Sequence, residues 1–202
     1  FPEVSDPIRL VYQFDATIGP VFSQTIEMLK QFSYSRYMPL VFINRQLTEF
    51  ELQAQRNVGG FMKGILVKRL ESSFYAFKKS VGRFVKSYED FIQMFGEGRV
   101  LISKNINVYD LIDEDNEERI QRLIEEEKVQ EYQSNEFTPE FEQALENDLI
   151  ILKDIRKLWN PIDADPKLDK FVSELETGGN LFGKKILVFT ESLETGEYLF
   201  GK

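Results

Sequence analysis

The sequence predicts a predominantly α-helical protein with long amphipathic helices, short β segments and the first strand of an α/β lobe at the C-terminus. Three observations lead to this fold class. Apolar residues recur every three or four positions over most of the chain, which is the period of a helix buried on one face. Short runs of β-branched and aromatic residues interrupt that pattern. From position 163 onward the order changes to helix, strand and helix, as in α/β domains.

Composition excludes several classes of protein. The chain has 202 residues, 42% of them apolar, and no apolar run approaches the roughly 20 residues of a membrane span. It begins with Phe1 and has no basic and apolar leader, so we expect a cytoplasmic protein without a membrane partner, cut from a longer chain. Cysteine and histidine are both absent. Their absence removes thiolate and imidazole chemistry, which disfavours a free-standing enzyme.

The N-terminal part reads as an arm followed by helices. Residues 8–14 alternate well enough for a short strand and fit an extended arm equally well. Pro20 suits a first helical turn, and apolar residues at helical spacing follow it as far as Phe32. A second apolar stretch at 37–43 is expected to form another core helix.

The strongest helical pattern runs from about 47 to 95. Gly59 and Gly60 are expected to break or kink it near its start, because glycine lowers helix stability. One long helix is expected after that pair. Its apolar face consists of Phe61, Ile65, Leu66, Leu70, Phe74, Phe77, Val81, Phe84, Tyr88, Phe91 and Ile92.

The next region combines a short strand with acidic helices. Residues 99–103 follow a glycine-rich turn and have the β-branched character of a strand. Between 110 and 148 the chain carries fifteen acidic and three basic residues, which predicts a solvated acidic helical region. Within it, Thr138 and Pro139 are suited to begin a helix that continues to Trp159.

The C-terminal part predicts a helix over 166–175, a turn at Gly178 and Gly179, a buried strand over 185–190 and a helix over 192–199. We therefore divide the chain into a helical unit, 1–162, and the truncated start of a second unit, 163–202. One oddity is that residues 175–184 recur nearly unchanged as residues 193–202. The repeat has no evident function.

Two segments resemble a known family. Residues 59–80, with 34–40 upstream, are similar to the helical region between the motor lobes of bacterial Swi/Snf-like superfamily 2 DNA helicases, a type that can carry a phospholipase-D-like nuclease domain. Residues 166–171 followed by 185–195 resemble the start of the second RecA-like lobe, where a short helix precedes the strand of helicase motif IV. The resemblance covers nearly the whole chain.

The resemblance implies part of an ATP-dependent DNA helicase or translocase. In that family the first lobe supplies the phosphate-binding loop and the acidic magnesium motif. This chain has no complete G-x-x-x-x-G-K-[ST] and no Asp-Glu-x-His, so ATP and Mg²⁺ are implied only for the intact protein and hydrolysis by this chain alone is not expected. The implied partners are duplex DNA and the first RecA-like lobe of the same protein, whose reading frame would extend beyond both ends.

The region 61–88 carries seven basic residues and one acidic residue, Glu71. Such an excess is a candidate track for DNA phosphates, and it is equally the solvated face of an amphipathic helix or a partner for the acidic region. Arg69 could clamp a phosphate or the lobes, or form an ion pair that fixes packing. The resemblance to motif IV adds Thr190 and Ser192, at the end of its strand, to the candidates for DNA contact. The candidate nucleic-acid-binding residues are Lys68, Arg69, Lys78, Lys79, Arg83, Thr190 and Ser192.

Other readings remain beside this one. The aromatic residues from Phe74 to Phe91 could stack bases, but their helical spacing favours a core. The acidic runs 113–115 and 125–127 look solvated rather than metal-binding or catalytic. The main functional alternative is a helical protein–protein interaction module with an acidic, regulatory or DNA-mimicking surface.

Overall fold

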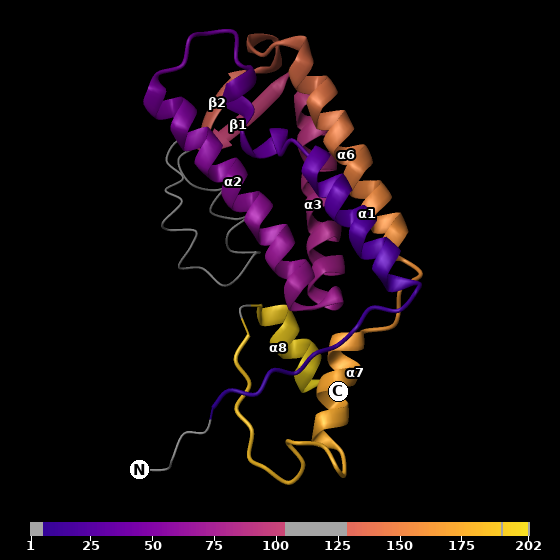
Figure 1. Cartoon of the computed structure of the whole chain (residues 1–202). Coiled ribbons are helices and arrows are strands. Elements are labelled where there is room, and N and C mark those ends of the chain that lie inside the picture. Colours follow the sequence, from indigo (N-terminus) through magenta and orange to yellow (C-terminus); the bar gives the residue numbers. More distant parts are fainter. Residues whose placement is uncertain (1–5, 104–128, 191, 202) are drawn as a thin grey trace.

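A computed structural model describes residues 6–103, 129–190 and 192–201. As predicted, the described chain is mostly helical, with one two-stranded sheet (Figure 1). None of the described helices is long and apolar enough to cross a membrane. The α-helices are α1 (Ile18–Gln31), α2 (Glu49–Ser72), α3 (Phe74–Gly96), α6 (Pro139–Trp159), α7 (Pro166–Leu175) and α8 (Leu193–Phe200).

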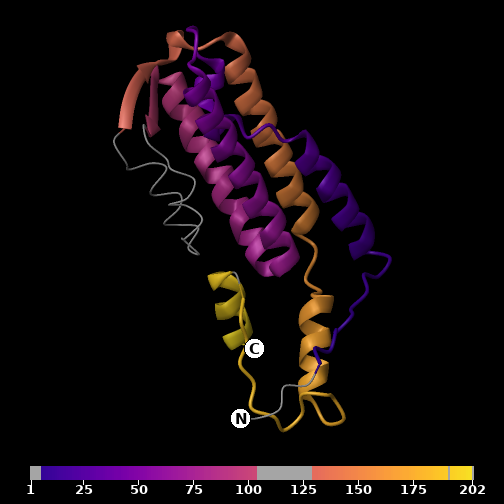
Figure 2. The same cartoon turned by 60° about the vertical axis from the view of Figure 1, so that its left-hand side comes forward.

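The single long helix expected after Gly59 and Gly60 is wrong. Helix α2 runs through both glycines, and the break falls at Ser73, whose backbone is extended (φ −157°, ψ 151°). The Ser73 hydroxyl accepts a hydrogen bond from the Ala76 amide at 3.1 Å, which caps α3. Helices α2 and α3 therefore form an antiparallel hairpin (Figures 1 and 2). Gly59 leaves room for the side chain of Met38, which would have to move if a Cβ were added here.

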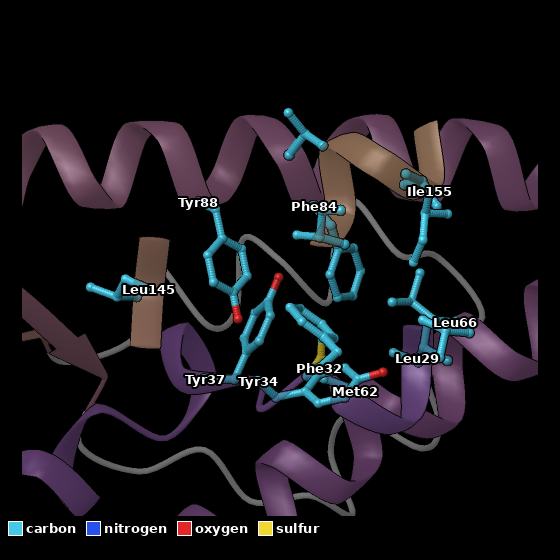
Figure 3. Close-up of a cluster of buried hydrophobic side chains, with 14 of the residues drawn as sticks. Leu29, Phe32, Tyr34, Tyr37, Met62, Leu66, Phe84, Tyr88, Leu145 and Ile155 are labelled. Atoms are coloured by element: carbon cyan, nitrogen blue, oxygen red, sulfur yellow. The ribbon is translucent and has the colours of Figure 1, made fainter. Parts of the chain in front are cut away.

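The hydrophobic core lies between α1, α2, α3 and α6. Figure 3 shows side chains from these helices and from the turn Ser35–Tyr37 (η1) pointing toward one another. The five aromatic residues assigned to the apolar stripe of α3 are buried in this core, so their interpretation as packing residues is confirmed. Their burial leaves none of them on the surface to stack bases. These residues are Phe74, Phe77, Phe84, Tyr88 and Phe91.

A buried carboxylate ties the core together. Asp148 on α6 is 1% exposed. Its oxygens accept hydrogen bonds from the amides and hydroxyls of Ser33 and Ser35 at 2.7–2.9 Å, and from the Tyr88 hydroxyl at 2.9 Å. Burial, with the nearby Asp148 charge, raises the pKa of Tyr88 well above its usual value. One side chain thus joins α6, α3 and the turn after α1.

The segment expected to form a core helix at 37–43 instead makes two short 3₁₀ turns, η1 and η2 (Pro39–Phe42). Tyr34, the residue just before η1, has a left-handed backbone conformation (φ 59°). The amides of Ser33 and Ser35 bond to Asp148 instead of to a continuing helix, which explains why the chain turns here. Residues 8–14 are an arm, not a strand.

The strand predicted over 99–103 is confirmed as β1 (Arg99–Ser103), and it pairs antiparallel with β2 (Val129–Gln133). In the register Val100 faces Tyr132, and both are buried. Since β2 lies within the region predicted to be helical, that prediction is wrong for 129–133. Alternation of buried Tyr132 with exposed neighbours fits a strand packed on one face. Residues 110–128 lie outside the described part. Helix α6 has its predicted bounds, and the turn η3 (Ser134–Glu136) precedes it.

Below the bundle, the C-terminal part forms α7, a glycine turn, an irregular segment and α8 (Figure 2). The buried strand predicted over 185–190 is wrong. This segment has no regular structure, and Leu187 and Phe189 are 78% and 86% exposed. A strand that is apolar on both faces needs a sheet around it, and no described segment pairs with it. The two-unit division of the chain stays a prediction.

The near-repeat adopts two structures from almost the same residues. In the first copy α7 ends at Leu175, and Gly178 turns the chain with a positive φ of 95°. The second copy continues as helix α8. The copies differ at their centre, where Gly179 and Asn180 stand in place of Glu197 and Tyr198. Glycine favours the turn, and the Asn180 amide and side chain both donate to the Glu174 carboxylate.

Replacing Gly179 with alanine is expected to open this turn, because the added Cβ would lie 2.3 Å from the backbone oxygen of Glu174. We expect a loss of about 1–3 kcal/mol in the local opening free energy, as at other strained positions, seen as faster amide exchange over 175–184. Gly60→Ala is the control. Nothing lies within 4 Å of its added Cβ, so this change should stabilise α2 by about 0.5–1 kcal/mol. Unchanged exchange in Gly179→Ala would contradict the geometry.

Candidate functional site

The candidate site is a buried polar junction where α8 meets the end of the α2–α3 hairpin. We call it the clasp and define it by seven residues. These are Ser72, Ser73, Arg69, Arg83, Ser192, Glu194 and Thr195. It lies where the lower end of the hairpin approaches α8 in Figure 1.

Glu194 is the centre of the clasp. Its side chain is 12% exposed and lies between an arginine from α2 and an arginine from α3. Arg83 donates to one carboxylate oxygen at 2.6 Å, whereas Arg69 lies 3.9 Å from the other. The Ser192 hydroxyl, at the N-cap of α8, donates to that second oxygen at 3.1 Å. Because charge-assisted hydrogen bonds in a buried setting are strong and directional, this carboxylate fixes α8 to α3 through Arg83, and it also lies within ion-pair distance of Arg69 on α2.

The electrostatics favour the ionised carboxylate. Burial alone would raise the pKa of Glu194, but its backbone amide, Arg83, Arg69 and Ser192 together hold the pKa below its usual value. A carboxyl with a lowered pKa stabilises the folded form above its unfolded pKa and loses that contribution as the pH falls through the folded value. The clasp is therefore expected to weaken in acid.

Hydroxyl groups and aromatic rings extend the junction. The Thr195 hydroxyl is hydrogen-bonded to those of Ser72 and Ser73, each at 2.9 Å. Further along α8, the ring of Tyr198 stacks on Tyr75 of α3 with centroids 4.8 Å apart and an interplanar angle of 8°. The ammonium nitrogen of Lys79 lies over the ring of Tyr75, 4.7 Å from its centroid. The contact between α8 and the hairpin thus combines charge, hydroxyl and ring contacts.

Two lysine contacts attach α7 and the residues just before it to the hairpin. Lys167 of α7 donates to the backbone oxygens of Glu71 and Ser72 at 2.9 and 3.0 Å. This places a cation at the C-terminal end of α2, where the helix dipole is negative. Lys78 of α3 donates to the backbone oxygen of Ile162, just before α7. Both ends of the C-terminal part are therefore tied to the hairpin.

A half-open pocket of about 160 Å³ lies beside the clasp. Its wall is mostly apolar, with Asp165 and the clasp hydroxyls as polar groups. It is formed by the end of the hairpin, α7, the irregular segment and α8. The lining residues are Ser72, Ser73, Asp165, Lys167, Leu168, Phe171, Val188, Phe189, Thr190, Thr195, Tyr198 and Leu199.

The structure brings four of the seven candidate DNA-contacting residues to the clasp. Arg69, Arg83 and Ser192 belong to it, and the Thr190 hydroxyl accepts a hydrogen bond from the Ser192 amide at 3.2 Å. The other three do not belong to the clasp. Lys68 is exposed on α2, Lys79 is exposed over Tyr75, and Lys78 contacts the chain before α7. A nucleic-acid role for the seven stays a prediction, whereas the ion-pair interpretation of Arg69 is supported by its contact with Glu194.

The described residues include neither a complete phosphate-binding loop nor a group of acidic side chains arranged to hold a metal ion. Gly178, Gly183 and Lys184 have the G-x-x-x-x-G-K spacing, but Lys185 replaces the hydroxyl residue. A helix, α7, precedes this segment, whereas a phosphate-binding loop joins a strand to a following helix. Among the described residues, no group of three or more acidic side chains is arranged to hold a metal ion.

Sequence reasoning missed the two carboxylates that matter most. Glu194 lies near the C-terminus, and Asp148 lies at the end of the acidic region, but neither differs in local pattern from its exposed acidic neighbours. Glu176 occupies the same place in the first repeat copy as Glu194 in the second, and it is exposed. Glu194 is buried and Glu176 is exposed because α8 packs against the two arginines.

Comparison of the chain with protein-family models, curated proteins and solved structures gave no match.

Proposed function

We propose that the chain is part of an ATP-dependent DNA helicase or translocase, in which the helical unit braces the two motor lobes and residues 163–202 begin the second lobe. The class of protein comes from the resemblance of residues 59–80 and 185–195. The observation that supports the bracing role is the position of Glu194, which joins α8 to both helices of the hairpin. Because these contacts hold α8 against the hairpin, we expect the two to move together.

The contacts divide the basic residues between two roles. Arg69 and Arg83 bind Glu194, and Lys78 binds the chain before α7, so these three support the bracing role. Lys68 and Lys79 are exposed, which suits contact with DNA phosphates. ATP and Mg²⁺ would be bound by segments outside this chain, whose described residues offer no complete site for either.

The DNA-binding part is tested by fluorescence-anisotropy titration of the chain with labelled duplex DNA at several salt concentrations. We expect binding that weakens steeply with salt, because lysine contacts to phosphate release counterions. The double change Lys68→Glu and Lys79→Glu should weaken binding at low salt by about tenfold and make the salt dependence shallower. The matched control is Lys153→Glu with Lys157→Glu, two exposed positions on α6. No binding at low salt, or equal loss in both variants, would remove DNA contact from the proposal.

The motor part is tested in the longer protein that the proposal expects, with a phosphate-binding loop upstream and arginine-bearing motifs downstream. Glu194→Gln removes the charge of the clasp and keeps its shape. We expect DNA-stimulated ATP hydrolysis to fall about 5-fold or more, as for other losses of coupling between sites, with basal hydrolysis retained. Glu176→Gln is the control in the other repeat copy. A reading frame without those motifs would reject the motor, and equal activity of both variants would reject the bracing role.

A second candidate function is a helical module that binds a protein partner. The exposed apolar side chains of Leu187, Phe189 and Phe200 favour it, because neighbouring exposed apolar residues commonly mark contact surfaces. This candidate predicts a complex that survives high salt and needs no nucleotide. Changing Leu187 and Phe189 to serine should abolish such a complex and leave DNA binding unchanged.

A further inference from the structure

We infer that the pocket beside the clasp binds the base of a nucleotide, and that Asp165 selects guanine there. The inference deepens the DNA-contact part of the proposed function and rests on it, because it adds a contact for an unpaired base to the contacts for phosphates. The pocket has a volume of about 160 Å³. A cavity of about 150 Å³ can hold one benzene ring, so a flat base that projects through the open side fits in size.

The wall of the pocket offers aromatic rings and one buried carboxylate. Phe171 and Phe189 both line it, and Phe189 is 86% exposed, so its ring is accessible to a ligand. Bases of single strands stack on such side chains. Asp165 lines the same pocket and is only 7% exposed. Proteins that recognise unpaired bases combine these two features, a ring for the face of the base and a polar group for its edge.

Asp165 has hydrogen-bonding capacity left for a ligand. It is the N-cap of α7, and its Oδ1 atom accepts from the Leu168 amide at 3.0 Å. Burial and the Asp165 carboxylate, to which the Tyr198 hydroxyl donates, raise the pKa of Tyr198. These two donors occupy about half of the roughly four acceptor positions of a carboxylate. The other half can accept from the edge of a base.

Guanine matches this acceptor better than the other bases do. Its N1–H and N2–H₂ groups are neighbours on one edge, so guanine can donate two parallel hydrogen bonds to one carboxylate. Adenine and cytosine place a ring nitrogen with a lone pair beside their amino group, and that lone pair would face the carboxylate. Thymine has a carbonyl oxygen on either side of its only N–H. We therefore expect Asp165 to favour guanine.

Lys167 supplies a contact for the phosphate of the same nucleotide. Its ammonium group lines the pocket and donates to the backbone oxygens of Glu71 and Ser72. Because an ammonium group has three donors, one remains for a phosphate oxygen. The same cation disfavours an amine as the partner of Asp165, since like charges in one pocket repel. A neutral base attached to an anionic phosphate suits both side chains.

The test is fluorescence-anisotropy titration of the whole chain with two short labelled DNA strands at low salt. One strand is thymidine throughout except for a central guanine, and the other has hypoxanthine at that place, which lacks only the N2 amino group. We expect the guanine strand to bind about tenfold more tightly, because only guanine can donate both hydrogen bonds. Equal affinity of the two strands, or no binding of either, overturns the inference.

Four variants identify the groups responsible. Asp165→Ser removes the carboxylate and keeps a hydroxyl that caps α7, so it should bind both strands equally. Asp169→Ser, at an exposed position of the same helix, should keep the preference. Phe189→Ala should weaken binding to both strands about fivefold or more, because stacking does not depend on the base. Phe182→Ala, at an exposed position outside the pocket lining, should not. A guanine preference that survives in Asp165→Ser contradicts the assignment.

Parallel isothermal titrations with guanosine monophosphate and inosine monophosphate identify the source of the base. Saturable binding of guanosine monophosphate, tighter than that of inosine monophosphate, assigns the pocket to a free nucleotide, and a preference confined to strands assigns it to single-stranded nucleic acid. Failure of the inference would leave the proposed DNA contact intact. That contact is judged by the binding of duplex DNA, whose bases are paired, through Lys68 and Lys79.

Discussion

Replacing Asp148 with alanine is expected to lower the free energy of unfolding by about 3–5 kcal/mol, which is typical for removal of one partner from a buried charged network. The amides and hydroxyls of Ser33 and Ser35 and the hydroxyl of Tyr88 would all lose their acceptor. Urea unfolding followed by Trp159 fluorescence measures the loss.

The control for Asp148→Ala lies on the same helix. Asp154 is exposed, so Asp154→Ala should change the stability by no more than about 0.5 kcal/mol. Asp148→Asn should fall between the two, because the amide keeps one acceptor oxygen but turns an N–H₂ group toward the donors. Equal stability of Asp148→Ala and Asp154→Ala would show that the network does not hold the turn after α1 to α6.

Replacing Phe141 with alanine is expected to cost about 3–5 kcal/mol, the range for removal of a buried aromatic side chain. Phe141 is fully buried near the start of α6. Its ring lies 5.0–5.9 Å, centroid to centroid, from those of Phe42, Phe91, Phe95 and Phe137. The loss of one ring therefore leaves a cavity between the short turn η2, helix α3 and the end of the sheet.

Ile150 offers a matched change for Phe141, because it lies on α6 with 57% of its surface exposed. Ile150→Ala should cost well under 1 kcal/mol, since little apolar surface is returned to water. The two variants are compared by their midpoints of urea unfolding, given the same dependence of the unfolding free energy on urea concentration. A small effect of Phe141→Ala would mean that the neighbouring rings close the cavity, contrary to the close packing expected of a core.

Much of the helical content could be predicted because it depends on local periodicity. Helix α6 begins at Pro139 after Thr138 and ends at Trp159, as its sequence signals indicate. The hairpin between α2 and α3 could not be predicted in the same way. The apolar period continues through Ser73 without a phase change, and a serine in a helical pattern is a weak break signal.

The candidate site was predictable only in part. Arg69, Arg83 and Ser192 were identified by charge and by family resemblance, but their common partner Glu194 was not. Their approach depends on contacts between residues more than 100 positions apart in the chain. Such contacts leave no periodic signal in a single sequence, since they depend on how finished helices pack.

By itself, the sequence determined most of the helical segments and the apolar face of each, because both follow from side-chain spacing along one element. It also determined that cysteine and histidine chemistry is absent. The tertiary structure decided where the long pattern folds back and which of two glutamates in repeated segments becomes buried. Glu176 and Glu194 have nearly the same neighbours in sequence and opposite environments in space, because only α8 meets the two arginines of the hairpin.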